Sequence, residues 1–301
     1  MVLDSASMYF RAFFGVPEVL APDGTPVNAV RGFMDFISRL VGDYRPTHLV
    51  CAWDNDWRPQ WRVDLIPSYK AHRVVAAIPG PKPDIEEVPD PLEVQVPVIM
   101  EVLEAFGICV VGADGYEADD VIGTLATGAS MPVDVVTGDR DLFQLVDDKA
   151  GVRILYIAKG VGNHERVTDE FVVGKYRVLP SQYADFATMR GDASDGLPGV
   201  PGIGEKTAAT LLLRHGDLHG IIAAAADPES EMSPGPRRRI LEAADYLEVA
   251  PTVVAVARDI DLAPYDATLP SSPRDAARVE ALAERYNLDS PVKRLTVALA
   301  G

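Results

Sequence analysis

The residues best suited to chemistry are nine carboxylates that follow predicted strands, open a predicted helix or share one short loop. They are Asp4, Asp54, Glu117, Asp119, Asp120, Asp139, Asp141, Asp192 and Asp195. Ligands of an open parallel sheet bind beside the carboxyl ends of its strands, so we expect these side chains to converge there. Like charges held so close repel, and they raise one another's pKa unless cations neutralise them.

Divalent cations are the neutralising groups that such a ligand set favours. Side-chain oxygens without sulfur or imidazole select Mg²⁺ or Mn²⁺ over zinc, and nine carboxylates are more than one ion needs, so we expect two or more. Two ions about 4 Å apart suit phosphoryl transfer, because they activate a water, bind the scissile phosphate and stabilise the leaving oxygen. The five histidines have no ligand spacing, and no activated serine or cysteine nucleophile is evident. Any single acid, such as Asp119, Asp120 or Asp141, is also explained as a helix cap.

A glycine-rich segment near residue 200 is the second motif. It reads Gly199, Val200, Pro201, Gly202, Ile203, Gly204, Glu205, Lys206 and Thr207. Glu205 breaks the P-loop pattern, and Thr207 stands where a dinucleotide fingerprint has its third glycine. A helix-hairpin-helix fits better: its glycines let the backbone approach a phosphate at the following helix, with Lys206 and Thr207 assisting. A plain turn between helices is the alternative.

Charge is distributed unevenly along the chain. Residues 57–83 carry five cations and one acid, a net +4, whereas residues 84–148 carry sixteen acids and one arginine, a net −15. Trp57, Trp61 and Tyr69 are interleaved with the cations. Cations hold phosphates and flat rings stack on bases, so the basic block predicts a nucleic-acid contact surface.

The elements that must position these residues alternate along the first half of the chain. Strands are predicted at 1–3, 47–53, 108–111, 133–137 and 152–157, and helices at 28–44, 94–107, 117–127 and 140–146. Within 94–107 the apolar residues recur at every fourth position and Gly107 ends the pattern, as in a helix with one buried face. This alternation predicts an α/β fold, a parallel twisted sheet flanked by helices.

Two further stretches complete the expected organisation. Residues 74–97 contain six prolines and no apolar period, which predicts an exposed, mobile loop or arch. Residues 186–301 are predicted to be mostly helical and contain three consecutive arginines, Arg237 to Arg239, for which a duplex-backbone contact and a plain exposed turn are equally good interpretations.

Length and composition limit the classes of protein to which the chain can belong. The chain has 301 residues, 48% of them apolar, so it can bury a substantial core. A net charge of −17 excludes a protein that wraps nucleic acid with an overall basic surface, but not a local basic patch. Cys51 and Cys109 lie in apolar runs, the start does not read as a signal peptide, and no apolar run reaches membrane-spanning length. We expect a cytoplasmic protein with no membrane contact.

Five segments together resemble the 5′-nuclease family, which comprises the 5′→3′ exonuclease domain of bacterial DNA polymerase I and stand-alone flap endonucleases. They are VLDSASMYFRAFF, VCAWDNDWRPQWRVDLIPSYKAHR, GYEADDVIGTLA, VTGDRDLFQLV and GDASDGLPGVPGIGEKTA, in this order over residues 1–215. The resemblance implies a PIN-like α/β nuclease core over 1–185, with a helical arch or clamp at about 57–97. It further implies a C-terminal helical region over 186–301, with the helix-hairpin-helix at about 190–215.

The same resemblance implies roles for individual residues. Asp4, Asp54, Glu117, Asp119 and Asp120 match a first metal cluster, and Asp139, Asp141, Asp192 and Asp195 a second. Lys70 and Arg73 match a basic pair that contacts the scissile phosphate, with Arg62 and Tyr69 as helpers. The hairpin of Gly199, Gly202 and Gly204 matches a duplex-gripping motif that often holds a monovalent cation such as K⁺.

The implied activity is metal-dependent hydrolysis of phosphodiester bonds, as exonuclease and flap endonuclease, by a monomer acting in DNA replication and repair. The implied partner is nicked or branched DNA with a free 5′ end or 5′ flap, including flaps that carry an RNA primer.

Three departures from the family pattern leave every carboxylate in place. The strand before Asp4 is short, Ser5-Ala6-Ser7 replaces a usual Gly-Asn/His-Ser, and Gly196 stands where asparagine is common.

Two other classes were weighed. A phosphatase that forms an aspartyl-phosphate would use Asp54 and Asp56, but Trp57 stands where that class has Thr or Val. A non-catalytic DNA-structure-binding module predicts lost ligands, and none is lost.

Overall fold

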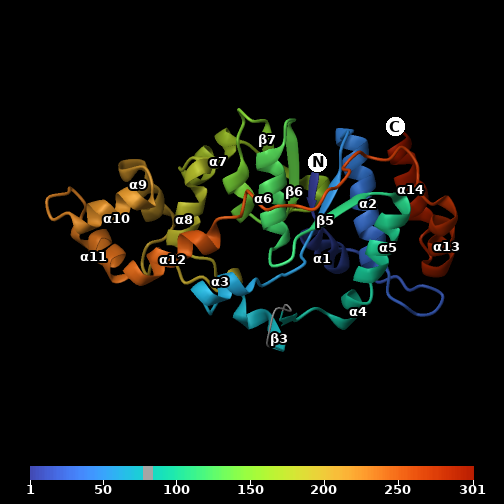
Figure 1. Cartoon of the computed structure of the whole chain (residues 1–301), viewed down its shortest axis with the longest axis horizontal. Helices are drawn as coiled ribbons and strands as arrows, with labels where there is room; N and C mark the ends of the chain where they lie inside the picture. Colours follow the sequence, from blue (N-terminus) through green and yellow to red (C-terminus); the bar gives the residue numbers. More distant parts are fainter. Residues whose placement is uncertain (77–83) are drawn as a thin grey trace.

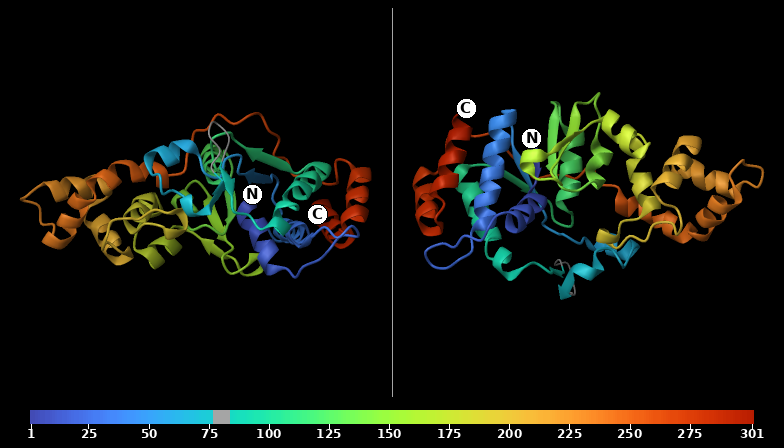
Figure 2. Two further views of the ribbon diagram at one scale, coloured as in Figure 1. Left: turned by 90° about the horizontal axis from the view of Figure 1, so that it is seen from below. Right: turned by 180° about the vertical axis from the view of Figure 1, so that it is seen from behind.

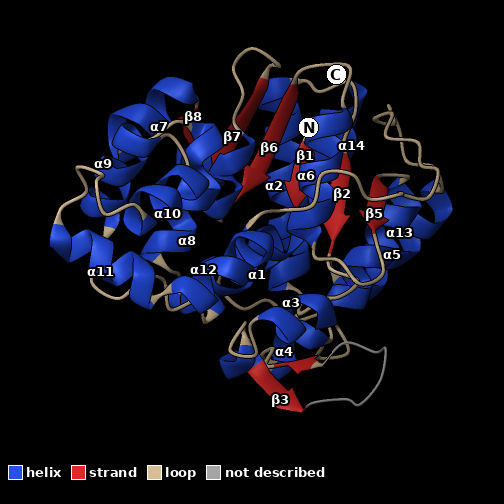
Figure 3. Cartoon of the chain, turned by 60° about the vertical axis from the view of Figure 1, so that its left-hand side comes forward, coloured by secondary structure: helices blue, strands red, loops and turns tan. Residues whose placement is uncertain are grey.

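The structure is a computed structural model that describes residues 1–76 and 84–301. Its centre is a six-stranded sheet in the order β5-β2-β1-β6-β7-β8 (Figures 1 and 3). The strands are β1 (Val2–Asp4), β2 (Val50–Trp53), β5 (Cys109–Gly112), β6 (Val133–Thr137), β7 (Val152–Tyr156) and β8 (Glu165–Val167). All neighbours are parallel except β7 and β8. The predicted parallel sheet is confirmed, and the short antiparallel edge strand β8 is an addition.

Helices cover both faces of this sheet. Alternating side chains of a strand point to opposite faces, so Val2 and Val135 join one apolar core while Leu3 and Val136 join the other. The first core is shared with α6 (Ala118–Gly128), the 3₁₀ helix η2 (Asp141–Leu145) and α7 (Asp169–Tyr176). The second is shared with α1 (Ser5–Gly15), α2 (Asn28–Tyr44) and α5 (Val96–Phe106).

The strand order creates a switch point beside β1. From β1 the chain moves outward through β2 to β5, and it then returns to the other side of β1 as β6. Connections leave in opposite directions on the two sides of such a point, which opens a crevice at the carboxyl ends of the strands. Asp4 ends β1, Asp54 follows β2, and Asp139 stands two residues beyond β6.

Helices α2, α5 and α6 lie close to their predicted ranges, whereas other helical segments of the core differ from the prediction. The segment predicted as a helix at 140–146 forms the 3₁₀ helix η2. Helices α1 and α7 were not predicted; α1 begins directly where β1 ends, without an intervening loop. Asp4 makes this junction: it ends the strand, and its carboxylate accepts from the amide of Ser7 as the helix cap.

The segment expected to be an arch lies at the carboxyl ends of the strands (Figure 3). Its elements are α3 (Gln60–Leu65), the 3₁₀ helix η1 (Ala71–Arg73), the antiparallel pair β3 (Val74–Ala76) and β4 (Ile85–Glu86), and α4 (Asp90–Glu93). Part of the proline-rich stretch thus carries short regular structure where a loop was expected. Residues 77–83, which include Pro79, Pro81, Lys82 and Pro83, lie outside the described residues.

The C-terminal helices divide into two groups. The first group forms the lobe at the left of Figure 1: α8 (Tyr183–Arg190), α9 (Glu205–His215), α10 (Leu218–Ala226), α11 (Pro234–Glu242) and α12 (Ala244–Val254). The chain then crosses back to the core, as Figure 2 also shows. There α13 (Ala276–Tyr286) and α14 (Asp289–Ala300) bury Val279, Leu282 and Leu295 in the core shared with α2 and α5. The last two helices of the expected C-terminal region at 186–301 thus pack on the α/β core.

Within the described residues, none of the helices has the length and apolar character that crossing a membrane requires.

Candidate active site

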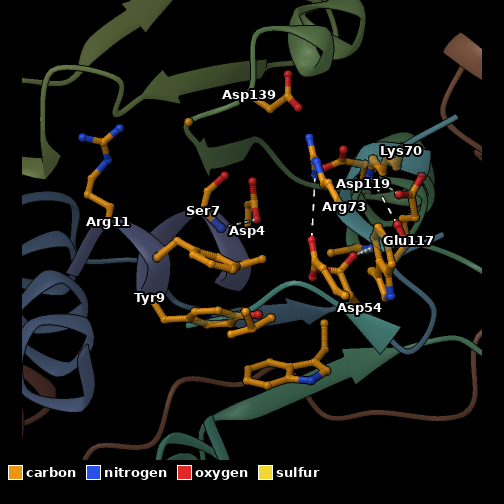
Figure 4. A pocket seen from close by; sticks show the side chains of 18 of the residues that line it. Asp4, Ser7, Tyr9, Arg11, Asp54, Lys70, Arg73, Glu117, Asp119 and Asp139 are labelled. Carbon is orange, nitrogen blue, oxygen red and sulfur yellow. Dashed lines mark hydrogen bonds and ion pairs between the residues drawn. The ribbon is translucent and has the colours of Figure 1, made fainter. Parts of the chain in front are cut away.

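A cavity of about 780 Å³ opens at the carboxyl ends of β1, β2 and β6 (Figure 4). Its walls hold six of the nine candidate acids, namely Asp4, Asp54, Glu117, Asp119, Asp139 and Asp192. These six come from five separate parts of the chain, since only Glu117 and Asp119 share an element, the start of α6. Carboxylates at the ends of the strands therefore converge on the crevice, as expected.

Backbone and side-chain hydrogen bonds fix the acids at the strand ends. Asp4 accepts from the Ser7 amide at 3.0 Å and from the Thr137 hydroxyl at 2.6 Å, so it links β1, α1 and β6. Asp54 accepts from the amide of Ala118 at 2.7 Å, at the amino end of α6. Such charge-assisted bonds hold each carboxylate in one orientation.

The turn after β6 positions Asp139 in the same way. The amide of Asp139 donates to the hydroxyl of Thr137 at 2.9 Å, and its carboxylate accepts from the amide of Asp141 at 2.8 Å. Asp141 itself points to Arg190, 3.3 Å away, and does not line the cavity. Of these two acids, Asp139 lines the cavity and Asp141 does not, and their role as metal ligands stays a prediction.

The loop between α8 and the glycine hairpin supplies the last pair. Asp192 accepts from the amide of Ser194 at 2.8 Å and lies 3.5 Å from both Arg140 and Arg190. Asp195 lies 3.1 Å from a guanidinium nitrogen of Arg73 and does not line the cavity.

Two of the predicted cations lie in the cavity wall. The Lys70 ammonium contacts the Glu117 carboxylate, and Arg73 pairs with Asp195. Lys70 has a left-handed backbone conformation, with φ of 48°, and its amide donates to the carbonyl of Asp195 at 2.9 Å. The segment carrying both cations is thus attached to the acidic loop.

Arg62, Asp120 and Tyr69 do not reach the cavity. The guanidinium of Arg62 is 2% exposed and donates to both carboxylate oxygens of Asp120 at 2.7 Å. The hydroxyl of Tyr69, which is 3% exposed, donates to Glu117 at 2.6 Å. The expected ligand Asp120, catalytic cation Arg62 and DNA contact Tyr69 are instead buried groups that hold Glu117 and the start of α6.

The described cations of the basic block all face carboxylates in this structure. The pairs are Arg58 with Asp84, Arg62 with Asp120 and Glu117, Lys70 with Glu117, and Arg73 with Asp195. The described cations of the basic block are therefore each compensated by at least one acid, most of them from the acidic block. The fifth cation, Lys82, lies outside the described residues.

Three of the six cavity acids, Asp54, Asp119 and Asp139, hold their protons more tightly than acids in water do, whereas, against the effect of burial, hydrogen bonds from Ser194 and the charges of Arg190 and Arg140 lower the pKa of Asp192. Burial raises the pKa of Asp54 to about 7, with Glu117 and Asp4 adding to the rise. Burial, together with the charges of Asp141 and Asp195, raises the pKa of Asp139 to about 8. Burial likewise raises the pKa of Asp119 well above its usual range, assisted by Asp139. A cavity that resists ionisation in this way favours the binding of additional positive charge.

The donor set fits divalent ions, although the side chains do not enclose one as they stand. In residues 1–76 and 84–301, no three acidic, histidine or cysteine side chains are gathered closely enough to hold an ion. Repulsion among carboxylates spreads them apart, and Lys70, Arg73 and Arg190 draw several of them aside. The candidate donors are all carboxylate oxygens, which is the donor type of a hard-cation site.

Arg11 is a cavity residue that the sequence analysis missed. It lines the wall opposite Lys70 and Arg73 (Figure 4), on α1 and one helical turn after Ser7. Its Nε atom is buried without a hydrogen-bond partner, and no ion pair to Arg11 exists among the described residues. A Cβ atom on Gly138 would lie 3.8 Å from its Nη2 atom, so the guanidinium lies beside the turn that carries Asp139. Prediction of α1 would have revealed it, because residues four apart share a helix face.

The glycine hairpin lies between α8 and α9. Gly199 and Gly202 have φ values of 66° and 78°, and Gly204 directly precedes α9. A Cβ atom on Gly199 would lie 2.6 Å from the amide nitrogen of Gly191, so the hairpin and the acidic loop cross in close backbone contact. Lys206 is exposed and Thr207 half-buried in the first turn of α9.

The sequence matches two family descriptions that together cover most of the chain. Residues 1–177 match the 5′-3′ exonuclease N-terminal resolvase-like domain, and residues 178–276 match the 5′-3′ exonuclease C-terminal SAM fold.

Among curated relatives, a 5′-3′ exonuclease of Streptomyces coelicolor is 61% identical over 99% of both chains. A 5′-3′ exonuclease of Mycobacterium tuberculosis is 51% identical over 99% of this chain and 97% of its own. DNA polymerase I of M. tuberculosis is 38% identical over the whole of this chain and 32% of its own length.

Solved structures share the fold at low sequence identity. A flap endonuclease of bacteriophage T5, solved as a pseudo-enzyme-product complex with DNA and metal ions, has a TM-score of 0.64 at 16% identity. The alignment covers 100% of this chain and 99% of that one. Flap endonuclease-1 from Methanococcus jannaschii has a TM-score of 0.62 at 16% identity, over 100% and 92% of the two chains. The chain belongs to the 5′-3′ exonuclease family.

Proposed function

We propose that this nuclease is a structure-selective, divalent-metal-dependent enzyme that hydrolyses phosphodiester bonds in DNA with a free 5′ end or a 5′ flap. The observation that carries the proposal is the single cavity at the switch point of the sheet. Six carboxylates from five parts of the chain line it, together with Lys70, Arg73 and Arg11. A site that combines oxygen ligands for hard cations with positively charged side chains suits a phosphodiester substrate.

The carboxylates form two groups for two ions, which we assign as Mg²⁺ or Mn²⁺. Asp4, Asp54, Glu117 and Asp119 form the first group, and Asp139 and Asp192 the second, with Asp141 and Asp195 behind them. When bound, such ions supply activation of water and stabilisation of charge on the scissile phosphate and the leaving oxygen. Metal ions in several solved structures that share the fold, zinc in one of them, support the binding of divalent ions.

The protein's own cations have a separate task. Lys70 and Arg73 stand beside Glu117 and Asp195, from where their charges reach a phosphate in the cavity. Positive groups placed where charge develops on a phosphoryl oxygen lower the barrier to hydrolysis. Arg62 and Tyr69 contribute by holding the Glu117 carboxylate.

The substrate requirement is assigned from the surroundings of the cavity. The segment 57–76 with 84–97 lies next to it and suits a single-stranded 5′ end, while the hairpin at 199–204 suits the backbone of a duplex. DNA in the T5 complex supports the same assignment. The proposal also includes a monovalent cation such as K⁺ at the hairpin. It further includes flaps that carry an RNA primer as substrates, and action of the protein as a monomer.

A cleavage assay tests the proposal. A 5′-labelled flap duplex incubated with Mg²⁺ or Mn²⁺ is expected to yield fragments cut near the junction, and none with EDTA. Cleavage that persists in EDTA would contradict metal dependence. A stable phosphorylated enzyme would instead indicate the phosphatase class.

Arg11→Ala is expected to raise KM for flap DNA about tenfold, because a charge-assisted contact to phosphate is lost. The folded state should be unaffected, since Arg11 makes no ion pair among the described residues. Steady-state kinetics would measure the change, with Arg39→Ala on the neighbouring α2 as the surface control. Equal KM values for the two variants would argue against a phosphate contact by Arg11.

The raised pKa values predict how pH changes the stability of the metal-free protein. Asp54 and Asp139 titrate at about 7 and about 8 when folded, well above their unfolded pKa, so the folded state retains protons that the unfolded state releases. Their stabilising contribution is complete at low pH and is lost as pH rises through these values.

The melting temperature without metal should therefore fall between about pH 6 and about pH 8.5. Added Mg²⁺ should raise it more at the higher pH, because the ion then neutralises ionised carboxylates. Differential scanning fluorimetry with and without Mg²⁺ checks both points. The same Mg²⁺ effect at both pH values would show that these acids do not bind the ion.

A further inference from the structure

The three consecutive arginines at 237–239, which the sequence left without a role, have three different surroundings on α11. Arg237 donates to the carbonyl of Ser230 at 2.9 Å and also contacts the carbonyl of Asp227, so it closes the loop between α10 and α11. Arg238 is exposed and pairs with Glu242 on its own helix at 3.7 Å. Only Arg239 reaches to the glycine hairpin.

The contact between Arg239 and the hairpin is close and specific. Its Nη1 atom donates to the carbonyl oxygen of Gly202 at 2.7 Å. A Cβ atom on Gly202 would lie 2.9 Å from both the Cζ and the Nε atoms of Arg239, so the guanidinium rests directly against this glycine. Gly202 also has a positive φ of 78°. A side chain at position 202 would thus both strain the turn and displace the arginine.

The outer side of the hairpin is open. A Cβ atom on Gly204 would meet nothing within 4 Å, and α9 begins there without a side-chain cap. The first-turn amides of α9 therefore have no side-chain acceptor at the cap, and Lys206 stands exposed beside them. The open side of the hairpin is the one suited to a phosphate, whereas Gly202 is held by the guanidinium of Arg239.

We propose that Arg239 is a positioning residue for duplex binding, which holds the glycine hairpin in the shape that receives the phosphodiester backbone of double-stranded DNA. This inference rests on the proposed function, in which the hairpin binds the duplex. A turn rich in glycine has many accessible backbone conformations, and a hydrogen bond from a charged donor to its central carbonyl selects one of them. Preorganised backbone donors bind a ligand more tightly because less ordering accompanies binding.

The test compares Arg239→Ala, Arg239→Lys and Arg238→Ala in the full chain. The last is a matched control, because it removes the adjacent arginine of the same helix, which among the described residues pairs with exposed Glu242. For a flap duplex, Arg239→Ala is expected to raise KM about tenfold with kcat retained. Arg239→Lys should recover most of the loss, and Arg238→Ala should match the parent protein. On a single-stranded substrate all four proteins should have the same kcat/KM.

Three outcomes would overturn the inference. One is a KM for Arg239→Ala equal to that of Arg238→Ala on the duplex. Another is an equal loss on duplex and single strand, which would indicate a general defect of the fold. The third is no recovery in Arg239→Lys. A parent protein with no preference for duplex-containing DNA would contradict the proposed function itself. A parent protein with that preference, combined with any of the three outcomes above, would contradict only the role of Arg239.

Discussion

Asp139→Asn is expected to lower kcat on a flap substrate by at least about 1000-fold while DNA binding is retained. Asp139 lies in the cavity wall after β6, fixed by Thr137 and by the amide of Asp141. The amide of asparagine keeps the shape but removes a charge that a divalent ion requires. Metal assistance contributes several kcal/mol to phosphoryl transfer, and each 1.36 kcal/mol corresponds to about a tenfold rate change.

The matched control for this variant is Asp134→Asn. Asp134 belongs to the same strand, β6, but its half-buried pair with Arg153 lies away from the cavity. Kinetics of both variants at saturating Mg²⁺, with binding measured separately by fluorescence anisotropy, provide the comparison. Comparable kcat values for the two variants would exclude Asp139 as a metal ligand. Loss of DNA binding in Asp139→Asn would point to a role in substrate affinity instead.

Arg62→Ala is expected to lower the free energy of unfolding by about 3–5 kcal/mol, the usual effect of removing one partner of a buried ion pair. The guanidinium of Arg62 lies between Glu117 and Asp120 and also donates to the carbonyl of Val253 at 3.1 Å. Its removal leaves buried carboxylates without a cation, and it separates α3 from α12. Equilibrium urea unfolding measures the change.

Arg39→Ala serves as the control for Arg62→Ala. Arg39 pairs with Asp43 on α2 at 3.5 Å, and both side chains are more than half exposed, so its loss should change stability by less than about 0.5 kcal/mol. A similarly small change for Arg62→Ala would mean that the buried cluster does not stabilise the fold. If stability falls but kcat at low temperature does not, Glu117 keeps its position without Arg62.

Sequence reasoning located the site because its main signal is local. A carboxylate that follows a buried strand is visible in the sequence, and the topology of a parallel sheet then brings Asp4, Asp54 and Asp139 to one edge. Which acids reach the cavity depends on partners far away in the chain. Asp120 is withdrawn by Arg62, 58 residues earlier, and Asp141 is drawn aside by Arg190, 49 residues later. Motifs defined by short sequence spacings do not include residue pairs that are so far apart in the chain.

Long-range packing also explains the remaining differences in the fold. The apolar faces of α13 and α14 were compatible with a separate helical region, yet Val279 and Leu295 complete the core beneath α2 and α5. Arg11 was overlooked because the helix that carries it follows β1 without a loop and was not predicted. In each case the missing information was the position of another element in space.

Anomalous diffraction from a crystal soaked in Mn²⁺ tests the central assignment most directly. We expect two peaks inside the cavity, one bounded by Asp4, Asp54, Glu117 and Asp119 and the other by Asp139 and Asp192. A cavity without anomalous signal at saturating Mn²⁺, or ions bound only outside it, would contradict the assignment of these carboxylates as the metal ligands of the nuclease.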